Sequence, residues 1–246
     1  MKILNLFIAL ISVIFFWFLI NFFSDLPSFI LPSPISVFIS IKENFELLIY
    51  HLFFTLVEII LGLTIGLFLG VVTAIFLASS KTVTSILKPT LVFSQALPVF
   101  ALAPILTLWF GYGLWSKVVM AILIIFFPVT FAFFDGLTKT PSGYLDLAKT
   151  MGAKKIQILF KIRIPNAIPF LGSGIRLASV YAPIGAVIGE WVGSSNGLGY
   201  LMLLANGRVK IDLMFASMLF LGILSILLYF LADLFAKFIS YETNMN

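Results

Sequence analysis

Three charged residues stand out within long apolar stretches of the sequence: Glu58, Arg176 and Glu190. A charge near the centre of a bilayer costs at least about 2.5 kcal/mol unless another charge, a carbonyl group or water compensates it. Residues of this kind therefore mark a transport pathway or a gate, or they form ion pairs within the protein. We treat all three as candidate pathway or gate residues.

The sequence offers few residues for a metal site, a nucleotide-binding site or a catalytic site. The chain contains no cysteine, and its single histidine, His51, leaves too few ligands for a zinc site. The phosphate-binding pattern G-x-x-x-x-G-K-[ST] does not occur. No nucleophile with a neighbouring base and no carboxylate dyad is recognisable, which argues against a membrane-embedded enzyme. We therefore expect no catalytic residues, no metal and no bound cofactor.

Membrane-spanning helices are the elements that must position the three charges. The chain of 246 residues is 61% hydrophobic and only 10% charged, whereas a soluble domain needs roughly 25% charged residues. A transmembrane helix needs about 20 mostly apolar residues, and six windows qualify. They are residues 3–23, 52–78, 90–111, 115–134, 166–190 and 213–237. The first has too long an apolar run for a typical signal peptide. The prediction is an all-α, polytopic membrane protein with six transmembrane helices.

Two local patterns refine this prediction. Residues 24–50 contain "LPSP" at 31–34 and then a weakly amphipathic stretch, so a short interfacial helix is expected there. The fifth window is rich in glycine, alanine and serine, which allow helices to approach closely in lipid. These small residues could pack within the chain, or they could line a pore or a dimer interface.

The distribution of basic residues predicts the orientation of the spans, because cytoplasmic loops carry an excess of Lys and Arg. With the N-terminus inside, ten basic residues are cytoplasmic and four are external, and Arg176 lies within a span. The cytoplasmic set is Lys2, Lys81, Lys88, Lys139, Lys149, Lys154, Lys155, Lys161, Arg163 and Lys237, and the external set is Lys42, Lys117, Arg208 and Lys210. Both termini are expected in the cytoplasm. The net charge of +5 is not gathered on a soluble amphipathic surface, so no nucleic-acid partner is expected.

The most basic connection, "GYLDLAKTMGAKKIQILFKIRIP" at 143–165, falls on the cytoplasmic side between spans four and five. Gly152 could end a first helix, because glycine adopts the left-handed cap conformation without penalty. From Ile156 to Ile164 apolar residues alternate with period two, as in a half-buried strand. A lone strand has no partner in a helical membrane protein, so the second element stays ambiguous. An ordinary basic loop is the alternative for the whole segment.

This segment resembles the cytoplasmic EAA loop of ABC importer permeases, the transmembrane subunits of binding-protein-dependent uptake systems. The family pattern is Glu-Ala-Ala, three residues, Gly, nine residues, Ile, one residue, Leu-Pro. Leu147 and Ile164 depart from this pattern, and an aspartate replaces the first glutamate. The positions that correspond are Asp146, Ala148, Gly152, Ile162 and Pro165.

The resemblance implies the transmembrane domain of a type I ABC importer, over about residues 51–240, with the coupling loop at about 141–165. Residues 1–50 would add an N-terminal span and the interfacial segment. The implied partners are ABC ATPase subunits that bind the ATP, a periplasmic or lipid-anchored solute-binding protein, and a second permease copy, most simply a homodimer. The basic residues of the loop could pair with acids on the ATPase or with anionic membrane lipid.

The same resemblance bears on the intramembrane charges. Specificity in this family lies mainly in the binding protein, so a structural or gating role is favoured for Arg176 over substrate contact. Glu58 and Glu190 both fall toward the outer ends of their spans, where they could form an outer gate or contact the binding protein.

The finer resemblance concerns the substrate. "ALAPILTLWFGYGLWSK" at 101–117 and "GEWVGSSNGLGYLMLLANGR" at 189–208 look like the branch for nitrate, sulfonate, taurine and pyrimidine compounds. Within this branch the sequence looks most like permeases for hydroxymethylpyrimidine, a thiamine precursor. A sulfonate, taurine or nitrate permease is the alternative. A bacterial cytoplasmic (inner) membrane location follows. The rival from another class is an ATP-independent secondary transporter, against which we find no internal repeat.

Overall fold

The computed structural model describes residues 2–24 and 26–245, which fold into helices with no strand among them. This confirms the predicted all-α class. The helices are α1 (Lys2–Phe23), α2 (Pro34–Glu43), α3 (Phe45–Ala78), α4 (Lys81–Ala96), α5 (Val99–Phe110), α6 (Leu114–Thr138), α7 (Ser142–Thr150), α8 (Lys155–Ile158), a π-helical turn (Leu159–Arg163), α9 (Ile164–Trp191), α10 (Leu198–Gly207) and α11 (Ile211–Met245).

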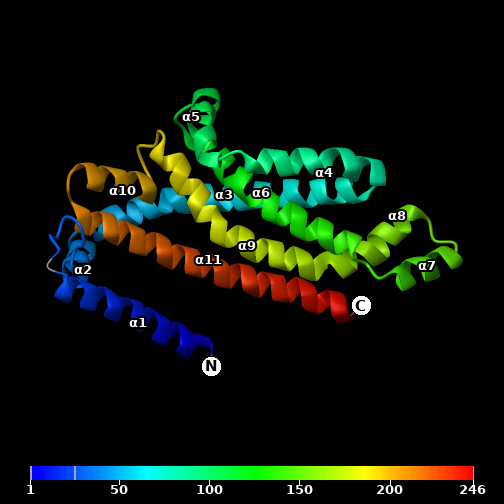
Figure 1. The fold of residues 1–246 in the computed structure, drawn as a ribbon, viewed down its shortest axis with the longest axis horizontal. Coiled ribbons are helices and arrows are strands. Elements are labelled where there is room, and N and C mark those ends of the chain that lie inside the picture. Colours follow the sequence, from blue (N-terminus) through cyan, green and yellow to red (C-terminus); the bar gives the residue numbers. More distant parts are fainter. Residues whose placement is uncertain (1, 25, 246) are drawn as a thin grey trace.

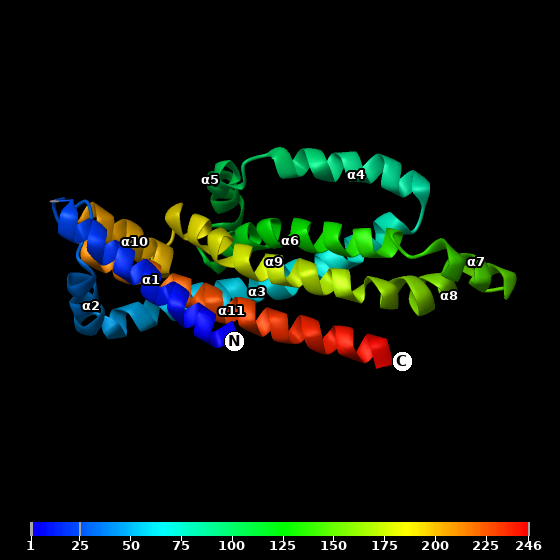
Figure 2. The same cartoon turned by 60° about the horizontal axis from the view of Figure 1, so that its bottom comes forward.

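Helices α3, α6, α9 and α11 run lengthwise beside one another and form the bundle (Figures 1 and 2). Glycine brings three of them into close contact. A Cβ atom at Gly62 of α3 would lie 2.6 Å from the Cβ of Ala121, and one at Gly185 of α9 would lie 2.7 Å from the Cα of Ala121. Helix α6 is thus held tightly between α3 and α9. Small residues of the fifth window, such as Gly185, therefore pack within the chain.

Four helices are long and apolar enough to cross a membrane: α3, α6, α9 with the turns before it, and α11. They coincide with four of the six expected windows. Helix α1 coincides with a fifth, although the apolar part with described side chains, Ile11–Phe23, is shorter than a full span. The remaining window, 90–111, is divided between α4 and α5, which together count as one further candidate span.

The window 90–111 is not the single continuous helix that its apolar composition suggested. The chain bends by 92° between α4 and α5. Leu97, the residue at the bend, is extended with φ −70° and ψ 127°, and Pro98 follows it. The ring of a proline clashes with a helical residue before it, so Leu97 is extended and α4 ends at Ala96.

The expected short helix in 24–50 is α2, which starts inside the "LPSP" motif. Ser33 caps it, because its Oγ accepts a hydrogen bond from the backbone N–H of Ser36 at 3.0 Å. The indole N–H of Trp17 in α1 donates to the carbonyl of Pro32 at 3.2 Å, and its ring stacks on Phe215 of α11. These contacts fix α1 against the start of α11.

The two ends of the bundle differ in their architecture. Figure 1 shows α7 and α8 projecting beyond the bundle at one end, and α2 and α10 lying at the other. The distribution of basic residues predicts that the α7–α8 end is cytoplasmic. Each end, and the middle of the bundle between them, holds one group of the residues singled out in the sequence.

Candidate functional site

Glu190, at the end of α9, is the centre of a buried polar cluster at the α10 end of the bundle. Its side chain is only 1% exposed. The hydroxyl of Thr55 in α3 donates to its Oε1 at 2.6 Å, and the backbone N–H of Gly199 in α10 donates to its Oε2. The carboxylate therefore joins α9 to the next helix, α10, and to α3, which is distant in sequence.

Two side chains of α3 complete the attachment of α10. The backbone N–H of Gly197 donates to Nδ1 of His51 at 3.0 Å, and that of Leu198 donates to Oγ1 of Thr55 at 2.8 Å. The first amide groups of a helix have no partner within it, so these side chains supply the missing acceptors. We call His51, Thr55 and Glu190 the α10 clamp.

Gly197 is required for this geometry for two reasons. Its φ of +104° lies in a region that side chains disfavour, and a Cβ atom there would collide with the carboxyl group of Glu190. The clamp thus depends on the absence of a side chain at the start of α10.

Glu58 and Glu190, which the sequence placed at comparable depth, lie in contact within this cluster. Glu58 is 3% exposed, and its Oε2 has no hydrogen-bond partner among the described residues. A buried carboxyl oxygen without a partner is costly, so Oε2 of Glu58 is an unsatisfied atom of the cluster. The two glutamates form a buried carboxylate pair that sequence reasoning did not recognise.

Lys117 of α6 is a member of the cluster that sequence reasoning missed. It was counted among the external basic residues, but it is 2% exposed and lies close enough to both glutamates to interact electrostatically. Its ammonium group donates to the carbonyls of Tyr112, of Gly113 at 2.8 Å and of Gly193 at 3.2 Å. These bonds hold the turn before α6 against the end of α9, and three carbonyl partners explain why a lysine is tolerated there.

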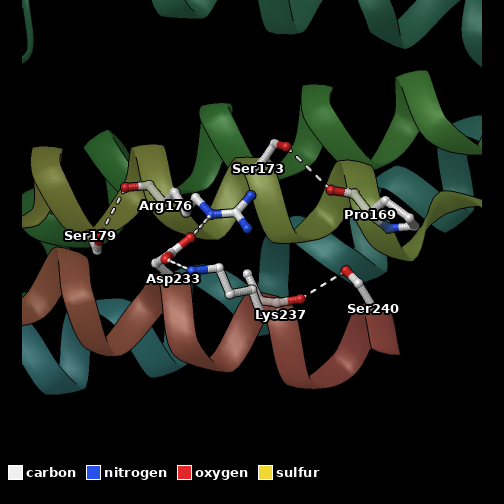
Figure 3. Close-up of polar contacts among 8 residues, drawn as sticks. Pro169, Ser173, Arg176, Ser179, Asp233, Lys237 and Ser240 are labelled. Carbon is white, nitrogen blue, oxygen red and sulfur yellow. Dashed lines mark hydrogen bonds and ion pairs between the residues drawn. The ribbon is translucent and has the colours of Figure 1, made fainter. Parts of the chain in front are cut away.

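Arg176 lies apart from this cluster, in the middle of α9. Figure 3 shows it facing Asp233 of α11, whose other oxygen contacts Lys237. Nε of Arg176 donates to Oδ1 of Asp233 at 2.7 Å, and the two side chains are 29% and 22% exposed. The ion pair within the protein is thus the arrangement observed. Sequence reasoning missed Asp233, although its spacing of four residues from Lys237 is a signal of a helix pair.

An apolar groove of about 460 Å³ runs along the bundle beside this ion pair. Side chains of α3, α6, α9 and α11 line it, and among its described lining residues only Thr64 and Ser179 carry hydroxyl groups. Ser179 donates to the carbonyl of Arg176 at 2.8 Å, within its own helix (Figure 3). The groove therefore offers a mostly apolar wall with two small polar groups.

The coupling-loop candidates at the other end form a capped helix. Helix α7 ends at Thr150, and Gly152 follows with φ +78°. The N–H of Gly152 donates to the carbonyl of Lys149, and that of Ala153 donates to the carbonyl of Ala148, each at 2.9 Å. This is the Schellman pattern, so the predicted helix end at Gly152 is confirmed.

Helix α7 presents a different surface on each side. Ala148 is buried against the protein. Tyr144, Leu147 and Met151, which share one helix face by their spacing of three and four residues, are 60%, 59% and 78% exposed. Asp146 lies on the surface and pairs with Lys149 at 2.9 Å. We call the three exposed apolar side chains the α7 face.

The strand-like alternation after Ile156 was misleading, because the segment is helical throughout. Helix α8 continues through the π turn into α9. In that turn the N–H of Ile164 donates to the carbonyl of Leu159, five residues earlier. Ile162 is half-buried within the turn, and Pro165 is the second residue of α9, inside the continuous helical stretch that begins at Lys155. Proline removes one backbone donor there, which membrane helices tolerate where neighbouring groups satisfy the freed carbonyl. The helix therefore continues through Pro165 into the membrane-spanning part of α9.

Comparison with known proteins decides the family. A family model described as "binding-protein-dependent transport system inner membrane component" matches residues 62–242. The chain belongs to this family. A probable ABC transporter permease protein of Haemophilus influenzae is 51% identical over 217 residues, covering 88% of this chain and 89% of that protein. The formylaminopyrimidine transport permease protein ThiX of Halalkalibacterium halodurans is 39% identical over 200 residues, with 81% and 80% covered.

The fold agrees with this assignment. A chain of the MetNI methionine ABC transporter, in an inward-facing conformation, superposes with a TM-score of 0.58. It is 21% identical and covers 85% of this chain and 98% of that chain. The permease fold of a type I ABC importer is thereby confirmed. The chain is a multi-pass membrane permease of the ABC importer class, and the ATP-independent transporter is set aside.

Proposed function

We propose that this permease carries a pyrimidine-type thiamine precursor, such as hydroxymethylpyrimidine, into a bacterial cell. The support for this substrate class is the 39% identity to a formylaminopyrimidine permease over 81% of the chain. We place the protein in the cytoplasmic membrane with both termini inside, because basic residues are concentrated at the α7–α8 side.

The observation that carries the transport mechanism is the exposed α7 face. Tyr144, Leu147 and Met151 form an apolar helix face at the tip of a projecting loop, and an apolar helix face laid into a groove is a recurrent mode of protein recognition. We propose that a separate ATPase subunit, which binds the ATP, receives α7 in such a groove. In this proposal Asp146 and Ala148 orient α7, and Gly152 sets its turn.

The continuous helix from α8 through α9 provides the mechanical link. Helix α9 has 28 residues and spans about 42 Å at 1.5 Å per residue. It begins at Ile164, directly after the π turn that contains Ile162, it carries Arg176 in its middle, and it ends next to Glu190. Movement of the ATPase at the loop is therefore transmitted along one helix to the α10 clamp. In this proposal Pro165 keeps the helix in register, and Glu58 and Glu190 act at the outer gate.

The remaining partners are proposed on family membership. A periplasmic or lipid-anchored binding protein delivers the substrate at the α10 end, and a second copy of this chain completes the pathway. The apolar groove beside the Arg176–Asp233 pair is our candidate for a pathway-facing wall. Site-directed crosslinking between two copies, with cysteines introduced at Thr64 of both, tests this placement in a chain that has no natural cysteine.

Uptake by proteoliposomes containing the permease, its ATPase and its binding protein tests the proposed function. We expect ATP-dependent uptake of labelled hydroxymethylpyrimidine that excess unlabelled taurine does not compete away. Uptake of taurine in its place would support the sulfonate alternative and contradict the proposed substrate.

A further inference from the structure

A second cavity lies at the cytoplasmic end of the permease, between the coupling loop and the junction of α3 with α4. Its volume is about 720 Å³. Four of the residues that line it are basic, namely Lys81, Lys149, Lys155 and Arg163, and none of the lining residues that the structure describes is acidic. Lys149 is partly neutralised by Asp146 at 2.9 Å, so three basic side chains remain uncompensated at its wall.

Arg163 has hydrogen-bonding capacity to spare. Its Nη1 donates to the carbonyl of Ala78 at 3.3 Å, which fixes the guanidinium group at the cavity wall. Its Nε is buried and has no partner among the described residues. The planar fork of a guanidinium group matches two oxygens of a phosphate. Arg163 lines the cavity, so its terminal nitrogens are the groups offered to a phosphate there, whereas the buried Nε is not exposed to the cavity.

The start of α4 adds a second favourable element for an anion. Helix α4 has 16 residues and begins at Lys81, and the Oγ of its cap Ser80 accepts from the N–H of Thr82 at 3.2 Å. Both Ser80 and Lys81 line the cavity. The amino end of a helix carries partial positive charge and free N–H groups. Like the basic side chains, it therefore favours an anion in the cavity.

The rest of the lining distinguishes a lipid from a free anion and from the ATPase. Leu145, Ile156 and Leu159 form an apolar wall beside the basic groups, and Ile156 is 64% exposed. A phosphate linked to acyl chains fits a lining that is basic on one side and apolar on the other. Leu145 and Lys149 of α7 line the cavity, but the residues of the α7 face, which form the proposed ATPase contact, do not.

We propose that this cavity binds the phosphate group of an anionic phospholipid from the inner leaflet. Arg163, Lys155 and the amino end of α4 hold the phosphate, and an acyl chain lies against Leu145 and Ile156. Anionic lipid then braces the coupling loop against the bundle at the point where the loop passes movement to α9. This inference rests on the proposed function for two points, the cytoplasmic placement of the cavity and the coupling role of the loop.

Native mass spectrometry of the purified full chain tests this site without the ATPase or transport, so its failure is separable from failure of the proposed function. Dioleoyl phosphatidylglycerol is compared with dioleoyl phosphatidylcholine at equal concentration. We expect preferential retention of phosphatidylglycerol, and a loss of about fivefold in Arg163→Gln, which is the effect of about 1 kcal/mol per basic residue near an anionic surface. Lys155→Gln, at an exposed side chain, repeats the test without disturbing the bond to Ala78.

Arg208→Gln is the matched control, because it removes the same charge from an exposed position at the opposite end. Retention unchanged in this control and reduced in both loop variants supports the site. Equal retention of the two lipids, or an equal loss in the control, would overturn it. Displacement of the lipid by inorganic phosphate at millimolar concentration would also overturn the lipid assignment.

Discussion

The α10 clamp makes a prediction that can be worked out from single hydrogen bonds. Thr55 is fully buried, and its hydroxyl both donates to Glu190 at 2.6 Å and accepts from the N–H of Leu198 at 2.8 Å. Thr55→Val keeps the shape of the side chain but removes both bonds. A hydrogen bond to a charged group contributes about 1.5–3 kcal/mol, and a buried N–H left without a partner costs about 1–3 kcal/mol.

These two effects overlap, so we expect the free energy of unfolding to fall by about 3 kcal/mol. The local effect at the start of α10 is the more specific measure. A loss of about 2 kcal/mol there raises the hydrogen-exchange rate of the Leu198 amide roughly 30-fold, since 1.4 kcal/mol corresponds to a factor of ten. Hydrogen exchange followed by mass spectrometry of peptides covering 197–200 measures this rate in detergent.

Thr130→Val is the matched control. Thr130 is equally buried, but its hydroxyl donates only within its own helix, to Phe126 at 2.7 Å. Exchange at Leu198 is expected to stay at the wild-type rate in this variant. If Thr55→Val also left the Leu198 amide exchanging within twofold of wild type, Thr55 would not be holding α10, and the clamp would be wrong.

Two further predictions concern the bundle. Asp233→Asn leaves Arg176 without its counter-charge, so the melting temperature should fall more than in Lys237→Gln, which removes an exposed partner only; equal falls would contradict the pairing. Gly185→Ala places a methyl group 2.7 Å from the backbone of α6 and should cost about 1–3 kcal/mol of stability in thermal unfolding. Its control, Gly222→Ala, meets no atom within 4 Å and should be neutral or stabilising; a neutral Gly185→Ala would refute the close packing.

The helical spans were predictable because each depends only on the summed hydrophobicity of a continuous run of residues. Long apolar runs such as the one in α3 identify a span by length and composition alone, with no knowledge of partners. The helix end at Gly152 was equally accessible, since a glycine cap is a local property of the backbone.

The misleading segments have physical reasons as well. The bend after Leu97 was signalled by Pro98, but prolines are tolerated in membrane helices, as Pro128 inside α6 shows, so the sequence did not distinguish a bend from a tolerated proline. The alternation after Ile156 arose in a short helix next to a π turn, where few residues are available to establish a period of 3.6.

The partners within the site could not be read from the sequence. Lys117 and Glu190 are 73 residues apart, and their approach depends on how α6 packs on α9. Glu58 and Glu190 were both placed toward the outer ends of their spans, at comparable depth, but depth does not specify which helices are neighbours. The sequence therefore indicated which charges matter, and the fold determined that Arg176 pairs with Asp233 while the glutamates meet elsewhere.

The central claim, that a separate ATPase drives this permease through its α7–α8 loop, is tested most directly by purification in a gentle detergent. We expect an ATPase with a phosphate-binding loop to copurify with the wild-type chain and to be lost with Gly152→Asp, which strains a backbone at φ +78°. Gly143→Asp adds the same charge to α7 at an unstrained, open position and should keep the ATPase bound. Purified chain that binds no ATPase, yet moves solute down an ion gradient on its own, would contradict the account.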